Sequence, residues 1–214
     1  MREDCWYKKV CTKDTCDNCI RYTEMSFLME NSGIPKKRQM PVSLVPDDID
    51  LDSFIHLADI KNDIEQFVRN GDNLYICSEH TGNGKTSWAI KLMLKYFDRV
   101  WAGNGLRVRG YFANVPTLLS MLKDFGNNNI EKVKTILSNT DLVVWDDIAS
   151  TKLSDFDITH LLMFIDHRTL QGLSNIYTGN IANKEQLGRC VGDRLASRIW
   201  NYSEIVEFKG NDRR

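Results

Sequence analysis

Gly82-Asn83-Gly84-Lys85-Thr86 lies between a short apolar run, Leu74-Tyr75-Ile76-Cys77, and a segment of helical periodicity that continues to Phe97. A loop of this kind turns backbone amides inward around phosphate, and its glycines permit the turn. The following helix adds the positive end of its dipole. Lys85 supplies a charge for the β- and γ-phosphates, and the Thr86 hydroxyl can ligate magnesium. The stretch therefore predicts a loop that binds a nucleoside triphosphate such as ATP.

Glu79 occupies the position at which the complete loop motif begins with glycine. The loop tolerates this residue if Glu79 keeps an allowed backbone conformation and points outward. The prediction depends on that condition.

A second motif pairs a buried strand with two carboxylates. Leu142-Val143-Val144-Trp145 is an apolar run typical of a central strand, and Asp146 and Asp147 follow it directly. In open α/β sheets, ligands bind at the carboxyl ends of the strands. We expect Asp146 to hold magnesium, directly or through water, and Asp147 to act as the general base toward water.

The rest of the chain alternates between the two periodicities. Strands are predicted at 108–113, 175–178 and 205–208, and helices at 57–68, 117–124, 130–138, 156–170, 184–187 and 193–200. Gly71 is expected to end the helix that precedes it. This alternation predicts an α/β fold with a parallel sheet covered on both faces.

The composition excludes several classes of protein. Hydrophobic residues make up 42% of the 214 residues and charged residues 27%, which argues against a disordered chain. Lys and Arg (28) nearly balance Asp and Glu (29), so a nucleic-acid site must be a local patch. No apolar run is long enough to span a bilayer, and no secretion signal opens the sequence, so a cytoplasmic protein is expected.

Proline divides the chain. Pro35, Pro41 and Pro46 disfavour both helix and central strand, which predicts a linker at 33–49. A short helix at 20–31 precedes it. The predicted organisation is an N-terminal module at 1–32, the linker, and a nucleotide-binding domain at 50–214.

Four of the six cysteines lie in the first nineteen residues: Cys5, Cys11, Cys16 and Cys19. In a reducing cytosol, metal binding is a better interpretation than disulfides. A tetrahedral set of four thiolates suits structural zinc, and metal binding could stabilise a module too small to fold alone. The alternative is four unliganded thiols in a flexible tail.

Four motifs occur in a recognisable order: 81–87 (TGNGKTS), 144–148 (VWDDI), 177–180 (YTGN) and 193–198 (DRLASR). Together they resemble the AAA+ ATPases of the DnaC/DnaI replicative helicase loader family, especially its short phage-type forms. The resemblance covers roughly residues 50–214. It implies a three-layer P-loop AAA+ core without a C-terminal helical lid, which fits the six residues that follow Phe208.

The resemblance assigns further site residues. Thr81 and Ser87 complete the phosphate loop, and Asn180 matches sensor I, a polar group near the γ-phosphate. Arg198, with Arg194 one turn earlier on the same helix face, matches the arginine finger that acts on a neighbouring subunit's nucleotide. Arg213 is a candidate for sensor II. From spacing alone, Arg194 and Arg198 could equally belong to a solvent-exposed helix face. Arg213 could equally belong to a disordered basic tail.

The resemblance also implies two macromolecular partners. Residues 112–139 match the family's initiator-type insertion and imply contact with single-stranded DNA, although Lys123, Lys132 and Lys134 there are more typical of solvated lysines. Some loaders of this family carry a zinc-binding N-terminal domain, which supports a zinc-binding N-terminal module here. This module is expected to dock on the replicative helicase. Its apolar face would consist of Trp6, Tyr7, Ile20, Phe27 and Leu28.

The predicted function is ATP-dependent loading of the replicative helicase onto single-stranded DNA during replication initiation. Hydrolysis is expected to be slow, because Asp147 is a methylene shorter than the glutamate often found there. Two alternatives stay open: a transposition helper ATPase of the IstB type, and a nucleotide-binding adaptor or inhibitor of the helicase without significant turnover.

Overall fold

Five apolar segments of the chain form one parallel β-sheet. The structure is a computed structural model that describes residues 2–3, 5–12, 16–39, 44–103, 105–124 and 130–210. The strands lie in the order β2-β3-β4-β1-β5, and every neighbouring pair is parallel. They are β1 (Asn73–Cys77), β2 (Gly110–Asn114), β3 (Leu142–Asp146), β4 (Ser174–Gly179) and β5 (Glu204–Glu207). This sheet confirms the predicted α/β fold.

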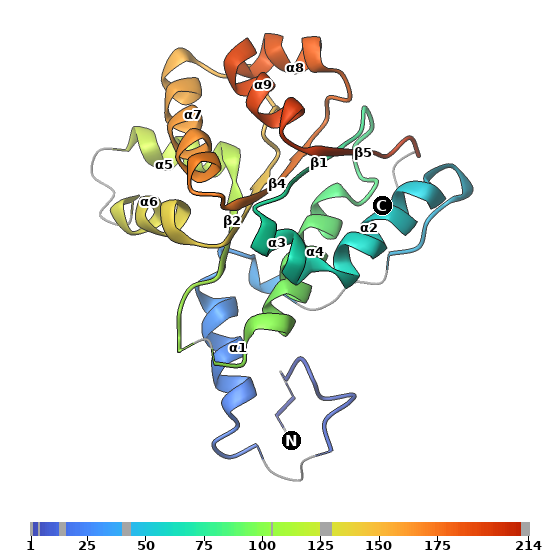
Figure 1. Cartoon of the computed structure of the whole chain (residues 1–214), viewed down its shortest axis with the longest axis vertical. Helices are drawn as coiled ribbons and strands as arrows, with labels where there is room; N and C mark the ends of the chain where they lie inside the picture. The colour runs from blue at the N-terminus through green and yellow to red at the C-terminus, as the bar shows by residue number, and fades with distance from the viewer. Residues whose placement is uncertain are drawn as a thin grey trace.

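Helices cover both faces of the sheet, which gives three layers (Figure 1). Alternate strand residues face opposite sides: Ile76 and Val144 pack in one cluster, Tyr75 and Trp145 in the other. The first face packs against α1 (Ile20–Glu30), α2 (Leu51–Asn62), α3 (Ile64–Asn70) and α4 (Lys85–Val100). The second packs against α5 (Val115–Lys123), α6 (Ile130–Asn139), α7 (Asp155–Leu170), α8 (Lys184–Val191) and α9 (Asp193–Asn201). None of the helices seen among the described residues is long and apolar enough to cross a membrane.

The helix predicted at 57–68 is two helices in the structure. Asp63, with φ −108° and ψ 22°, separates α2 from α3. Gly71 then ends α3 in the left-handed conformation at φ 75°, as expected for a helix-terminating glycine. The other predicted elements are present with shifts of a few residues at their ends, where local patterns carry least information.

Contacts with the sheet flank the predicted linker, of which the structure describes residues 33–39 and 44–49. It contains two short 3₁₀ helices, η1 (Lys36–Arg38) and η2 (Asp48–Asp50). The Phe112 amide of the edge strand β2 donates to the Ser32 carbonyl at 2.6 Å. At the other end, the Asp50 carboxylate accepts from the Lys209 amide at 2.7 Å. These two contacts lie at Ser32 and Asp50, immediately outside the two ends of the predicted linker.

Helix α1 packs against α4, and Leu28 is 1% exposed within the first core cluster. Trp6 and Tyr7 are partly buried against the same cluster. Leu28 is therefore unavailable for the docking face expected from the sequence, because it already packs against the rest of the chain. The division into 1–32, 33–49 and 50–214 stays a prediction.

A buried arginine joins α7 to the beginning of the central strands. Arg168 is 0% exposed and donates to the Asn175 Oδ1 at 2.7 Å and to three backbone carbonyls, those of Leu137, Thr140 and Ser174, at 2.6–2.8 Å. Burial lowers the pKa of Arg168 to about 10, so the side chain remains a cation at neutral pH. The guanidinium thus satisfies carbonyls that the helix and strand ends leave unpaired.

Candidate nucleotide-binding site

The phosphate loop joins β1 to α4 as the sequence predicted. Gly82 and Gly84 have φ values of 73° and 100°, which L-residues with side chains rarely adopt. Asn83 is buried between them and donates from its amide nitrogen to the Ser78 hydroxyl. Glu79 is exposed and is not among the residues with positive φ, so it meets the condition set for replacing the first glycine.

Lys85 is buried at the start of α4. Its Nζ donates to the His80 carbonyl at 2.7 Å and to the Asn83 Oδ1 at 3.1 Å. Both of these acceptors are uncharged oxygens, which orient the ammonium at the loop. A buried cation held by neutral oxygens at the mouth of a glycine loop fits a phosphate group.

Thr86 and Asp146 meet at the carboxyl end of β3. The Thr86 hydroxyl donates to the Asp146 Oδ1 at 2.7 Å, and the Thr178 hydroxyl of β4 donates to the same oxygen at 2.8 Å. The Asn114 amide of β2 approaches the other carboxylate oxygen at 3.5 Å. Hydroxyl and carboxylate oxygens are the ligands that magnesium prefers, so this pair fits the predicted metal position.

Asp147 has a distinct conformation and environment. Its φ of 59° is left-handed, and its amide donates to the Thr178 hydroxyl at 3.0 Å. Burial, and then the neighbouring Asp146 charge, raise the pKa of the Asp147 carboxyl, while Lys85 and Arg38 act in the opposite direction. A half-buried carboxyl group with a raised pKa is the kind of group that serves as a general base.

One cavity of about 610 Å³ brings these residues together. Its volume lies within the range typical of ligand pockets. Ten residues predicted from the sequence line it: Thr81, Gly82, Asn83, Gly84, Lys85, Thr86, Ser87, Asp146, Asp147 and Asn180. The loop and the acidic pair therefore face one crevice, as the predicted chemistry requires.

Three functional candidates were missed by the sequence analysis. Arg38 from the linker and Asn114 from β2 line the cavity, and Thr178 holds both aspartates. Thr178 lies two residues before Asn180 in the quoted motif, at the end of a predicted strand. This position could have predicted that Thr178 lies in the site. For Arg38, no local pattern indicated that the linker folds back to the nucleotide cavity.

The predicted finger arginines lie away from this cavity. Arg194 and Arg198 on α9 share one partner, Asp166 on α7, at 3.1 Å and 2.6 Å. A shared partner agrees with the prediction that the two cations lie on one helix face. Arg194 is 70% exposed at its side chain, so a neighbouring molecule can reach it. The sensor II candidate, Arg213, lies outside the described residues.

The predicted zinc set is not assembled in the structure. The structure describes all four cysteines, and none of them forms a disulfide. Cys5 is buried, and Cys11, Cys16 and Cys19 are half-buried. Among the described parts of the chain, no group of three or more His, Cys, Asp or Glu side chains is placed to hold a metal. The zinc site therefore stays a prediction without support from the structure.

The lysines of the 112–139 region are mostly paired. Lys123 contacts the Asp157 carboxylate at 2.8 Å, and Lys134 contacts Glu131 at 2.7 Å. Lys132 is exposed. These contacts agree with the interpretation of the lysines as ordinary surface residues.

No protein-family model and no curated protein matches the sequence. Solved structures do match. The DnaC helicase loader has a TM-score of 0.66 and 21% identity, with 82% of this chain and 100% of that one covered. DnaI has a TM-score of 0.66 and 20% identity, with 89% and 99% covered.

This chain has the fold of the DnaC helicase loader and of DnaI. A third match is the replication initiator DnaA bound to AMPPCP and single-stranded DNA, with a TM-score of 0.62, 15% identity and coverage of 78% of this chain and 49% of that one. This fold places the glycine loop and the acidic pair of the chain at the carboxyl edge of its parallel sheet, where ligands bind in open α/β sheets.

Proposed function

We propose that this protein is an ATP-dependent loader of a replicative DNA helicase onto single-stranded DNA. The observation that carries the ATPase part is the single cavity that joins Lys85, Thr86, Asp146, Asp147 and Asn180. The fold shared with the DnaC helicase loader and DnaI supports the loader part. The DnaA structure with single-stranded DNA supports a strand as the second partner.

The residues of the cavity divide the chemistry among them. Lys85 and the loop amides bind the β- and γ-phosphates, while Thr86 and Asp146 hold magnesium. Magnesium, when bound, neutralises charge on the β- and γ-phosphate oxygens. Asp147 orients the attacking water and accepts its proton, and Asn180 lies close to the γ-phosphate.

Arg194 and Arg198 act on the nucleotide of a neighbouring copy in this proposal. Both point to Asp166 within the isolated chain and take no part in its own cavity. Self-association would move the guanidinium of Arg198 from Asp166 to the γ-phosphate of the neighbour. A charge supplied in this way stabilises the transition state of phosphoryl transfer.

The first test is nucleotide binding. Calorimetry should detect ATP uptake by the wild-type chain and lose it for Lys85→Ala, whereas the exposed control Lys132→Ala should bind normally. Co-purification with a replicative helicase should then depend on ATP and fail for Lys85→Ala. Wild-type protein that takes up no ATP would refute the proposal, and binding without turnover would favour the adaptor alternative.

The second test mixes two inactive variants. Arg198→Ala keeps an intact nucleotide site, and Lys85→Ala keeps an intact arginine, so mixed assemblies should regain hydrolysis that neither variant shows alone. Arg189→Ala, an exposed change on α8, is the matched control and should hydrolyse ATP at the wild-type rate. A mixture as inactive as its components would show that Arg198 does not act between subunits.

A further inference from the structure

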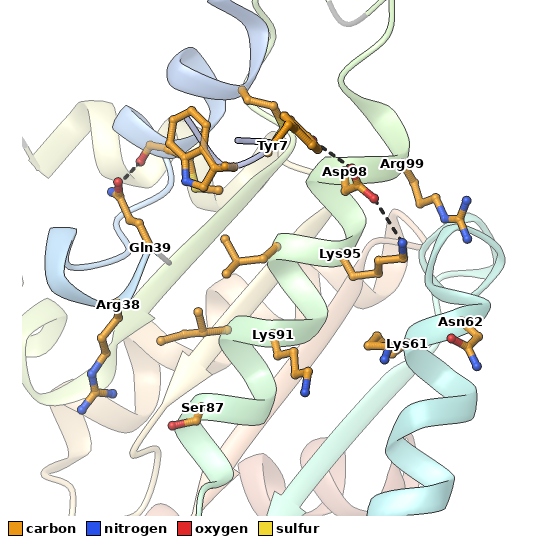
Figure 2. Close-up of a pocket in the computed structure, with 15 residues that line it drawn as sticks. Tyr7, Arg38, Gln39, Lys61, Asn62, Ser87, Lys91, Lys95, Asp98 and Arg99 are labelled. Atoms are coloured by element: carbon orange, nitrogen blue, oxygen red, sulfur yellow. Dashed lines mark hydrogen bonds and ion pairs between the residues drawn. The ribbon is translucent and has the colours of Figure 1, made fainter. Parts of the chain in front are cut away.

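A second cavity, of about 550 Å³, lies between α1, α2 and α4 (Figure 2). Its apolar lining comes from α1 and α4, with Met25, Met29, Ile90 and Leu94, and Trp6 lines it from the N-terminal segment. The cavity adjoins the nucleotide site, because Arg38 and Ser87 line both. We call it the α1–α4 groove.

Cations dominate the polar lining of this groove. It contains five, Arg38, Lys61, Lys91, Lys95 and Arg99, and one carboxylate, Asp98. Figure 2 shows Lys95 joined to Asp98, at 3.1 Å. The other four cations make no ion pair with any described residue. A concave surface lined by five cations and one carboxylate attracts an anion.

Asp98 adds little repulsion toward an anion because it is already engaged. It accepts from the Tyr7 hydroxyl at 2.8 Å, from Arg21 at 2.9 Å and from Lys95. Burial opposes its ionisation, but the hydrogen bonds from Tyr7, Lys95 and Arg21 hold the pKa of Asp98 below its usual value. The charge of the Asp98 carboxylate is therefore neutralised by Arg21 and Lys95.

Lys61 and Lys91 repel one another across the groove. Burial, and then the Lys61 charge, lower the pKa of Lys91. An anion between these two side chains would relieve the repulsion. A phosphate bound between Lys61 and Lys91 would therefore be stabilised most strongly by electrostatic attraction.

The cations of α4 repeat with a spacing that suits contacts with successive phosphates of a nucleic-acid strand. Lys91, Lys95 and Arg99 are four residues apart, so successive charges lie ~6 Å apart along the helix. A row of cations in a groove can follow the backbone of a single strand, whose unpaired bases are free to stack on aromatic side chains. Trp6 and Tyr7 in the same lining offer aromatic surface against which bases stack.

We propose that the α1–α4 groove binds a segment of single-stranded nucleic acid, with its phosphates on Lys61 and the α4 cations and a base against Trp6. The role of such a site rests on the proposed function, which requires a strand to be held. The groove places that strand beside the nucleotide cavity and away from the α5–α6 region that the family resemblance implied.

The test measures binding of a fluorescein-labelled oligo-dT of about 12 nucleotides by anisotropy. Lys61→Gln/Lys91→Gln is compared with Lys132→Gln/Lys134→Gln, which removes the same charge from α6. Each phosphate contact to a single strand contributes a slope of about −0.7 in log K against log salt, so losing two contacts at 0.1 M salt should weaken binding roughly 25-fold. The α6 control should stay within about twofold of wild type, and both variants should bind ATP normally.

The location of the contact has an independent readout. An oligonucleotide that carries 5-iodouracil should form its photo-crosslink at Trp6 or Tyr7. A crosslink confined to α5 or α6, or a loss of affinity in the α6 variant alone, would overturn the groove as the site while leaving the loader proposal intact. Wild-type protein that binds ATP but no oligo-dT would overturn both the groove and the DNA part of the loader proposal.

Competition separates a strand from other anions. Neither thymidine monophosphate nor polyglutamate of matched charge should displace oligo-dT at equal phosphate or carboxylate concentration. Equal competition by the mononucleotide would identify a free-nucleotide site, and equal competition by polyglutamate would identify a site for acidic peptides. Either result would overturn the proposal.

Discussion

Replacing Asp147 by asparagine should abolish most ATP hydrolysis while making the protein more stable at neutral pH. Asparagine has the same shape as aspartate and tolerates the left-handed φ of 59° seen at this position. The backbone amide that donates to the Thr178 hydroxyl at 3.0 Å is unaffected by the change. The substitution therefore removes a charge and leaves the local geometry in place.

The two effects have separate physical origins. General-base catalysis typically contributes 10²–10⁴-fold, so the rate of hydrolysis should fall by about that factor. ATP affinity should change by no more than about threefold, because Lys85 and the loop amides carry the phosphate contacts. Burial and Asp146 raise the pKa of Asp147 in the folded protein, so the native state holds this carboxylate ionised at a cost.

The sign of the pH dependence follows from that shift. A group whose folded pKa lies above its unfolded value stabilises the protein below the unfolded value, near 3.8 here, and this contribution is lost as pH rises through the folded pKa. Asp147→Asn should thus be more stable than wild type at pH 7.5, and the difference should shrink toward pH 4. The acid limb of wild-type hydrolysis should also lie above pH 3.8.

Single-turnover hydrolysis, nucleotide binding and urea unfolding at several pH values would check these expectations. Asp59→Asn, at an exposed position of α2, removes the same charge outside the cavity and should change neither rate nor affinity. Hydrolysis by Asp147→Asn within about fivefold of wild type would refute the role of Asp147 as base. A variant less stable than wild type at pH 7.5 would refute the electrostatic argument.

Three further changes test other parts of the structure. Arg168→Ala should lower the free energy of unfolding by about 3–5 kcal/mol, because it leaves several buried carbonyls unpaired; a urea midpoint close to wild type would contradict this. Thr178→Val should cost about 1–3 kcal/mol and weaken magnesium-dependent ATP binding, since the Asp146 carboxylate loses one donor; unchanged calorimetric affinity would argue against that role. Arg38→Gln should move the acid limb of hydrolysis to higher pH, because the Arg38 charge lowers the pKa of Asp147, and an unshifted pH–rate profile would show that Arg38 does not reach the site.

Most of the fold could be predicted because its signals are local. The apolar runs at 74–77 and 142–145 and the helical periodicity between them determined strand and helix positions. The break at Asp63 was missed because the apolar pattern continues across it from α2 into α3. Backbone conformation at one residue changed the element there without changing the periodicity.

The site was predictable only where a single segment carries the chemistry. The phosphate loop and Asp146-Asp147 each follow a strand of a parallel sheet, and the carboxyl ends of such strands share one edge. Arg38 could not be predicted, because its position depends on how the linker packs beside β2. The cysteine spacing suggested zinc, yet spacing along the chain does not determine where α1 and the preceding segment place the four thiols.

The sequence by itself determined the α/β class, the phosphate loop and the acidic pair, because each depends on neighbours within a few residues. Only the tertiary structure decided that Thr178 holds both aspartates, that Asp166 pairs with Arg194 and Arg198, and that five cations line one groove. These contacts join residues far apart in the chain. They arise from burying both faces of the sheet beneath helices, a long-range packing effect that no local pattern encodes.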